Sequence, residues 1–140
     1  MFFDQHPYDV KLEWGPRGAR AAAERGDIVI IVDVLSFSST VTTAIDHGAI
    51  IYPYPPPIHE KAQVYARSIG ADIVWGRAEA MKYGGHSLSP ESFTSIDQNQ
   101  KFVLCSLNGA ACTWIAAKVP ALLIGCLRNA SAVALLANQL

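Results

Sequence analysis

Acidic and hydroxyl side chains gather directly after one apolar run of the sequence. Residues 28–34 are mostly β-branched and include Asp33, and four hydroxyls follow, those of Ser36, Ser38, Ser39 and Thr40. Hydroxyls and backbone N–H groups at a strand-to-helix turn are suited to hold the oxygens of a phosphate. The alternative is ordinary helix capping, but a cap requires only one such side chain. The cluster therefore favours an anion site over capping alone.

Asp33 stands at the end of this otherwise apolar run. A carboxylate in such a place must be paired, protonated or bound to a metal. Mg²⁺, held by one or two carboxylates and by the phosphate oxygens of a substrate, is the simplest partner. We therefore predict that Asp33 is a catalytic residue and a metal ligand. A helix cap, or an ion pair with Arg77 or Arg128, is the alternative.

Further polar residues follow the other predicted strands. In open α/β sheets ligands bind beyond the carboxyl ends of the parallel strands, so these residues should share one edge. The predicted catalytic set adds Arg77, Glu79 and Arg128 to Asp33. The predicted phosphate-binding set adds Asn108, Gly109 and Asn129 to the four hydroxyls, although plain helix starts would also explain these three. His86, in a glycine-bearing loop, is the only histidine placed to act there.

The elements that would position these residues alternate between strands and helices. Strands are predicted at 10–14, 28–34, 49–52, 72–75, 101–105 and 121–125, and helices at 16–25, 39–47, 58–69, 108–119 and 130–140. The prolines after residue 52 should end that strand, and 76–88 is predicted to be a loop. This rhythm predicts a single α/β domain over residues 1–140. Its expected form is a layered α/β/α fold with a mostly parallel central sheet.

Composition narrows the functional classes. The chain of 140 residues is 51% hydrophobic and 16% charged, with a net charge of −1 and scattered basic residues, which argues against nucleic-acid binding. No apolar run could span a bilayer and no signal peptide is recognisable, so a cytoplasmic location is predicted. Three cysteines without metal-ligand spacing are predicted to be buried thiols. The high apolar content suggests a homo-oligomer or further polypeptide that covers some of the surface.

Four motifs, in order, resemble the 2-phosphosulfolactate phosphatase family. They are residues 32–35 with the hydroxyl-rich turn and the helix ending at His47-Gly48-Ala49, then Ser89-Pro90, then Asn108-Gly109, and finally residues 125–134. The agreement runs from about Asp27 to the last residue. Members of the family run on beyond residue 140, so the resemblance implies that this chain is the N-terminal portion of such a protein. It also implies a Mg²⁺-dependent hydrolase that releases phosphate from 2-phospho-3-sulfolactate in coenzyme M synthesis. By position, Asp33 matches the family's acidic residue.

The sequence departs from the family pattern in its cationic residues. Ser36 and Phe37 stand where the family usually has an arginine, and residues 76–80 replace a Gly-Glu-Arg-Gly-Gly loop. A phosphosulfonate needs cationic donors, and an arginine fork supplies bidentate recognition. The expected ligand is a small anionic phosphorylated or sulfonated molecule. The alternatives are a domain that binds phosphate or sulfonate without catalysis, and a domain that serves mainly in self-association.

Overall fold

A computed structural model describes residues 5–140, and every strand pairing within them is parallel. The strands are β1 (Val29–Val32), β2 (Ile50–Tyr54), β3 (Asp72–Val74), β4 (Lys101–Cys105) and β5 (Leu122–Gly125). The α-helices are α1 (Gly15–Arg25), α2 (Phe37–Asp46), α3 (Glu60–Ile69), α4 (Arg77–Tyr83), α5 (Gly109–Ile115) and α6 (Ala130–Ala137). Short 3₁₀ turns occur at η1 (Pro90–Ser92), η2 (Ser95–Asp97) and η3 (Leu127–Asn129). The predicted layered α/β class is confirmed.

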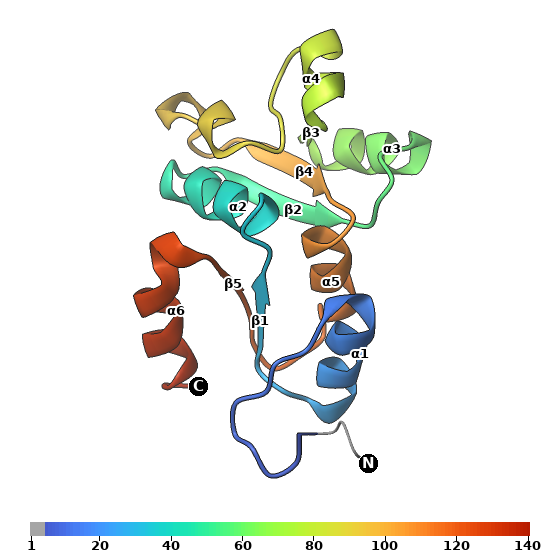
Figure 1. Cartoon of the computed structure of the whole chain (residues 1–140). Coiled ribbons are helices and arrows are strands. Elements are labelled where there is room, and N and C mark those ends of the chain that lie inside the picture. The colour runs from blue at the N-terminus through green and yellow to red at the C-terminus, as the bar shows by residue number, and fades with distance from the viewer. Residues whose placement is uncertain (1–4) are drawn as a thin grey trace.

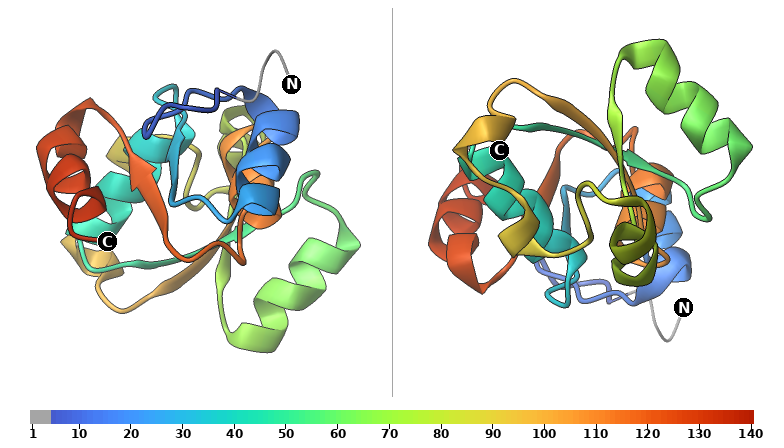
Figure 2. Two further views of the ribbon diagram at one scale, coloured as in Figure 1. Left: turned by 90° about the horizontal axis from the view of Figure 1, so that it is seen from below. Right: turned by 90° about the horizontal axis from the view of Figure 1, so that it is seen from above.

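The parallel strands form two small sheets where the sequence led us to expect one. One sheet has the order β1-β5 and the other β2-β4-β3, and their strands run in different directions in Figure 1. In Figures 1 and 2, α1 lies beside α5, and α6 lies beside β5. None of the helices within residues 5–140 has the length and apolar character needed to cross a bilayer.

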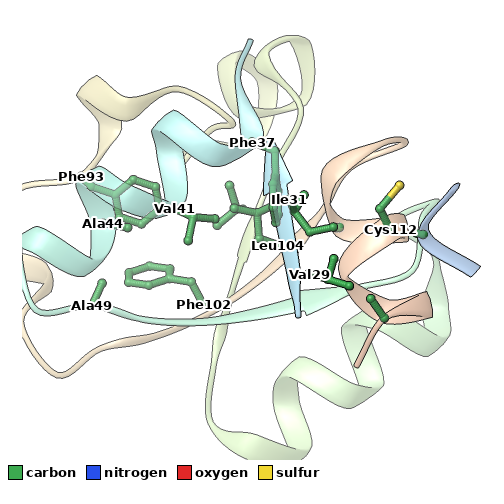
Figure 3. Close-up of a cluster of buried hydrophobic side chains, with 14 of the residues drawn as sticks. Val29, Ile31, Phe37, Val41, Ala44, Ala49, Phe93, Phe102, Leu104 and Cys112 are labelled. Atoms are coloured by element: carbon green, nitrogen blue, oxygen red, sulfur yellow. The ribbon is translucent and has the colours of Figure 1, made fainter. Parts of the chain in front are cut away.

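The main core lies between α2 and the second sheet (Figure 3). Phe37, Val41 and Ala44 line the inner side of α2, and Phe102 and Leu104 of β4 face them. Four of these five are completely inaccessible to solvent and Val41 is nearly so. Because α2 is held by this packing, the turn that precedes it is fixed relative to both sheets.

The predicted first strand, at 10–14, is wrong. In place of a neighbouring strand, the Gln5 side chain binds the backbone of Leu12. Its Nε2 donates to the Leu12 carbonyl at 2.7 Å and its Oε1 accepts from the Leu12 N–H at 2.9 Å. Val10, Leu12 and Trp14 alternate as expected, yet all three are at least 80% exposed. Alternation alone does not make a strand when no neighbouring strand pairs with it.

Two further differences concern proline and glycine. β2 continues through Pro53, which pairs in register with Leu104. It can do so because β2 is an edge strand, where the missing proline N–H interrupts no second ladder. The predicted loop over 76–88 contains α4, which begins after Gly76 and ends before Gly84. These glycines bound a helix, and its Ala, Glu, Met and Lys residues are good helix formers.

β1 is also less enclosed than a mostly β-branched run in a parallel sheet would lead us to expect. Val29 and Ile31 are buried, whereas Ile30 is 41% and Val32 63% exposed on the opposite face. Ile28 and Val34 continue this outward series at either end of the strand. The first sheet therefore has one covered and one open face, although parallel sheets are ordinarily covered on both.

Candidate functional site

The carboxyl ends of β1 and β5 lie side by side at one edge of the first sheet. Val32 pairs with Gly125 in the last register position, so Asp33 and Cys126 leave the sheet together. The turn into α2 follows Asp33, and η3 follows Cys126. The predicted meeting of these segments at a common edge is present in the structure.

Asp33 is joined to the start of α5. Its Oδ2 accepts a hydrogen bond from the backbone N–H of Gly109 at 3.0 Å. The negative charge thus lies where the unpaired N–H groups of a helix favour an anion. Burial, followed by the charge of Asp33, raises the pKa of the nearby Cys112 thiol. Within residues 5–140 nothing is hydrogen-bonded to the second carboxylate oxygen, Oδ1.

Ser38 holds the backbone on either side of Asp33. Its hydroxyl accepts from the Asp33 N–H at 2.9 Å and donates to the Ile31 carbonyl at 3.2 Å, and its own N–H donates to the Asp33 carbonyl at 2.7 Å. Ser38 is completely buried. Its hydroxyl has both of these roles inside the protein and is closed to solvent. The structure thus gives Ser38 the part of an internal brace for Asp33.

Gly109 is in direct contact with the Phe37 ring. A Cβ atom added to Gly109 would overlap the Cβ, Cγ and Cδ1 atoms of Phe37. This absence of a side chain lets α2 and α5 approach closely enough for the Gly109 N–H to meet Asp33. A glycine is therefore required here for close approach.

The remaining hydroxyls of the turn have different surroundings. Ser36 donates to the Leu88 carbonyl at 2.7 Å, and Ser39 donates to the Val34 carbonyl at 2.8 Å. Thr40 is fully buried, and its Oγ1 has no hydrogen-bond partner within residues 5–140. Of the four, Ser36 and Ser39 are partly accessible, whereas Ser38 and Thr40 face the interior.

The first turn of α5 is capped by a residue other than Asn108. Ser106 Oγ accepts from the Ala110 N–H at 2.8 Å, whereas the exposed Asn108 side chain makes no capping hydrogen bond. Asp33 accepts from the Gly109 N–H and Ser106 accepts from the Ala110 N–H, so two N–H groups in the first turn of α5 have hydrogen-bond partners. The exposed Asn108 amide is not used in capping this helix.

Cys126 lies among hydrogen-bonding groups, and its thiol donates to Thr42 Oγ1 at 3.6 Å. Burial raises the pKa of this thiol, but hydrogen bonding with Thr42, with the Arg128 and Asn129 backbone N–H groups and with Ser39 outweighs burial and lowers the pKa overall. Asn129 braces this turn, since its Oδ1 accepts from the Cys126 N–H at 2.8 Å and its Nδ2 donates to the Ile124 carbonyl at 2.9 Å. All three cysteines are buried, as predicted. No pattern in the sequence indicated that Cys126 is hydrogen-bonded to Ser39.

The predicted charged residues lie apart from Asp33. Arg128 is ion-paired with Asp46 and also donates to Thr43 Oγ1 at 2.9 Å, both near the end of α2. Arg77 and Glu79 lie exposed on α4, beyond β3 of the second sheet. Among the described residues, none of these three side chains forms a hydrogen bond or ion pair with Asp33.

His86 has a structural setting. Its Nε2 lies 3.0 Å from Asp97 Oδ1, and its ring packs against Phe93 and Phe102. Asp97 is buried and also caps η2 by accepting from the Thr94 N–H. This pair fixes the segment before Leu88, whose carbonyl receives the Ser36 hydroxyl. Sequence reasoning missed Asp97 entirely.

Comparison with known families decides the relationship. The sequence model of the family described as 2-phosphosulpholactate phosphatase matches residues 16–140. The chain belongs to that family. No curated protein and no solved structure gives a match. The matched range begins within α1 and includes every element of the edge described above, as the motif resemblance predicted.

The side chains at this edge can be compared with what a magnesium ion requires. Among residues 5–140 there is no group of three or more His, Cys, Asp or Glu side chains placed to hold a metal. Mg²⁺ usually keeps several waters and takes only one or two carboxylates together with substrate phosphates. Asp33, with Oδ1 open, fits such a shared arrangement, in which substrate and water supply most of the ligands.

Proposed function

We propose that this chain is a Mg²⁺-dependent phosphomonoester hydrolase that acts on a small anionic phosphoester at the edge containing Asp33. The proposal rests on the hydrogen bond from the Gly109 N–H to Asp33 Oδ2. This bond orients the carboxylate and leaves Oδ1 without a hydrogen bond from residues 5–140, so Oδ1 can bind a metal ion. Membership of a family named for a phosphatase supports the reaction class. The substrate implied by that name, a phosphosulpholactate, is the first compound to test.

Residues at this edge would bind the metal ion and the phosphate group. Asp33 would be a metal ligand, and Ser38 would hold its backbone in place. Mg²⁺, when bound, neutralises phosphate charge and orients the attacking water. Asn108, whose exposed side chain makes no capping hydrogen bond, would donate to phosphate oxygens, and so would the partly accessible Ser39 once its hydroxyl leaves the Val34 carbonyl. In the reaction a water oxygen bonds to phosphorus while the ester P–O bond breaks, and the departing alkoxide takes up a proton.

One observation favours a second candidate, a domain that binds phosphate or sulfonate without hydrolysis. A dianionic ligand calls for cationic donors, and among the described residues neither Arg77 nor Arg128 forms a hydrogen bond or ion pair with Asp33. In the hydrolase proposal, metal and helix N–H groups must supply the positive charge. In the binding-domain alternative the affinity for anions would be independent of Mg²⁺.

Phosphate release from a panel of small phosphomonoesters, measured with and without Mg²⁺, tests the proposal. We expect Mg²⁺-dependent turnover by the wild type and its loss in Asp33→Asn, which keeps the shape and an acceptor oxygen. Asp72→Asn is the matched control, because Asp72 is an exposed acid at the far end of the second sheet. Absence of turnover above Asp33→Asn on every ester, with anion-induced thermal stabilisation that ignores Mg²⁺, would favour the binding domain.

A further inference from the structure

Asn108 has an exposed side chain and is followed directly by Gly109. Its amide makes no capping hydrogen bond at the start of α5. Asn129 differs, because both ends of its amide are held, one by the Cys126 N–H and the other by the Ile124 carbonyl. The Asn108 side chain can therefore turn towards the backbone nitrogen of Gly109.

An asparagine before a glycine can react with its own backbone. The Gly109 nitrogen loses its proton and bonds to Cγ of Asn108, the bond from Cγ to the side-chain nitrogen breaks, and ammonia leaves with that proton. Glycine has no Cβ that would hinder the attack. Water then opens the cyclic imide at either carbonyl carbon, which leaves aspartate or isoaspartate at position 108. The reaction requires no oxidant, metal ion or second protein.

The peptide group between Asn108 and Gly109 is hydrogen-bonded at both of its polar atoms. The Gly109 N–H donates to Asp33 Oδ2 at 3.0 Å, and the Asn108 carbonyl accepts from the Cys112 N–H at 2.9 Å. The attack requires this peptide group to rotate towards the Asn108 side chain, so both bonds oppose it. It also requires the nitrogen to lose its proton, and a carboxylate at this distance disfavours a second negative charge. The contact with Asp33 thus opposes both steps.

We propose that Asn108 is a site of spontaneous deamidation that is restrained by the hydrogen bond from Gly109 to Asp33. The bond and the reaction exclude each other, because the imide nitrogen has no hydrogen that Asp33 could accept. Isoaspartate also inserts an extra carbon atom into the main chain at the start of α5. Either product places a further negative charge one residue from the Asp33 contact. The expected weakening of phosphate binding rests on the proposed function, whereas the modification itself does not.

Incubation of the full chain at pH 8 and 37 °C, followed by peptide mapping with mass spectrometry, measures the conversion of each asparagine. In the folded wild type we expect Asn108 to convert slowly. In urea, which removes both hydrogen bonds of the peptide group, conversion should be roughly 10-fold faster or more. Asn99 is the internal control, because it is also exposed but precedes Gln100. In urea it should convert more slowly than Asn108.

Variants of the folded chain test the part played by Asp33. Asp33→Ala should accelerate the conversion of Asn108 roughly 10-fold, since a hydrogen bond to a charged group contributes on this order. Asp33→Asn keeps an acceptor oxygen and removes the charge, so a smaller acceleration is expected, and it provides the test should Asp33→Ala fail to fold. Asp72→Ala, at an exposed acid of β3, should keep the wild-type rate.

Two kinds of result overturn the proposal. Asn108 is not such a site if it stays intact in urea, and the fold does not restrain it if the folded and unfolded wild type convert equally fast. Wild-type rates in the Asp33 variants that fold would show that Asp33 has no part in the restraint. None of these measurements requires turnover of a phosphoester, so their outcome is separate from that of the proposed hydrolase.

Discussion

Asp33 and Gly109 are 76 positions apart in the sequence and are joined by a hydrogen bond of 3.0 Å from a backbone N–H to a carboxylate oxygen. This single contact brings the end of β1 to the start of α5. It both satisfies a helix N-terminus and fixes the direction of the carboxylate. Substitutions at and around Asp33 can separate these structural and chemical consequences.

Substitutions of Asp33 should distinguish loss of charge from loss of the hydrogen bond. Asp33→Asn keeps an acceptor for the Gly109 N–H, so we expect a loss in unfolding free energy below about 1 kcal/mol. Asp33→Ala leaves that buried N–H unsatisfied and should cost roughly 1–3 kcal/mol. Urea unfolding measures both. Equal stabilities of the two variants would show that the hydrogen bond contributes nothing to folding.

Ser38 and Ser39 are adjacent hydroxyls with opposite expected effects. Ser38→Ala removes the acceptor for the Asp33 N–H and should destabilise the protein by roughly 1–3 kcal/mol. Ser39→Ala should change stability by less than about 1 kcal/mol but weaken phosphate binding, because Ser39 is partly accessible. Chemical denaturation and phosphate titration by calorimetry give the two readouts. The reverse pattern would contradict the assignment of Ser38 as a brace.

Gly109 should tolerate no side chain while Phe37 is present. Gly109→Ala brings a methyl group into the Phe37 ring, and overpacking of this kind costs about 1–3 kcal/mol. In the background of Phe37→Leu, where space is available, the same substitution should cost less. A double-mutant cycle measured by thermal unfolding gives the coupling between the two. If the two substitutions change the free energy of unfolding additively, the added methyl group does not contact Phe37 and the helices have moved apart.

Arg128 offers a test of a predicted catalytic cation. Its ion pair with Asp46 is more than half exposed, so breaking it should cost less than about 1 kcal/mol. If Arg128 neutralises phosphate charge during turnover, Arg128→Ala will lower kcat while Asp46→Ala will not. Steady-state kinetics with the best substrate of the ester panel decides this. Equal kinetics for the two variants and the wild type removes Arg128 from the site.

The Cys105 thiol predicts a pH dependence of stability. Burial raises its pKa from 9.0 to about 11 in the folded protein. Between these values the unfolded chain loses the proton and the folded chain keeps it, so stability is complete below about pH 9 and falls as the pH rises towards 11. The advantage of the wild type over Cys105→Ala should therefore shrink over this window. Urea midpoints at pH 8, 9, 10 and 10.5 check this, and a constant difference would contradict it.

The sequence placed Asp33 and Gly109 at a common edge by a rule for the parallel strands of one sheet. The two residues do meet, but β1 and β4 belong to different sheets, so the contact is made between the sheets. The sequence did not predict which hydroxyls would face a ligand. Ser38 and Ser39 differ only in the side of α2 that they occupy, and that side is set by packing of Phe37 and Val41 against the second sheet. Long-range packing of this kind leaves no local signal in the chain.

The misplaced charges have a similar origin. Arg128 follows β5 as expected, but its side chain reaches along the outside of α2 to Asp46, which depends on how that helix crosses the strand. Pro53 was expected to end a strand, and it is tolerated because β2 lies at an edge. Strand order and helix direction are properties of the assembled fold, so local patterns do not contain them.

The pair of His86 with Asp97 has a consequence at a distance. Through the Leu88 carbonyl it supports the hydroxyl of Ser36, which opens the turn leading into α2. Substitution of Asp97 should therefore make the serine-rich turn less ordered, even though the two are far apart in sequence. A genetic screen for restored activity in a Ser36 variant would be expected to recover compensating changes in the neighbourhood of η2.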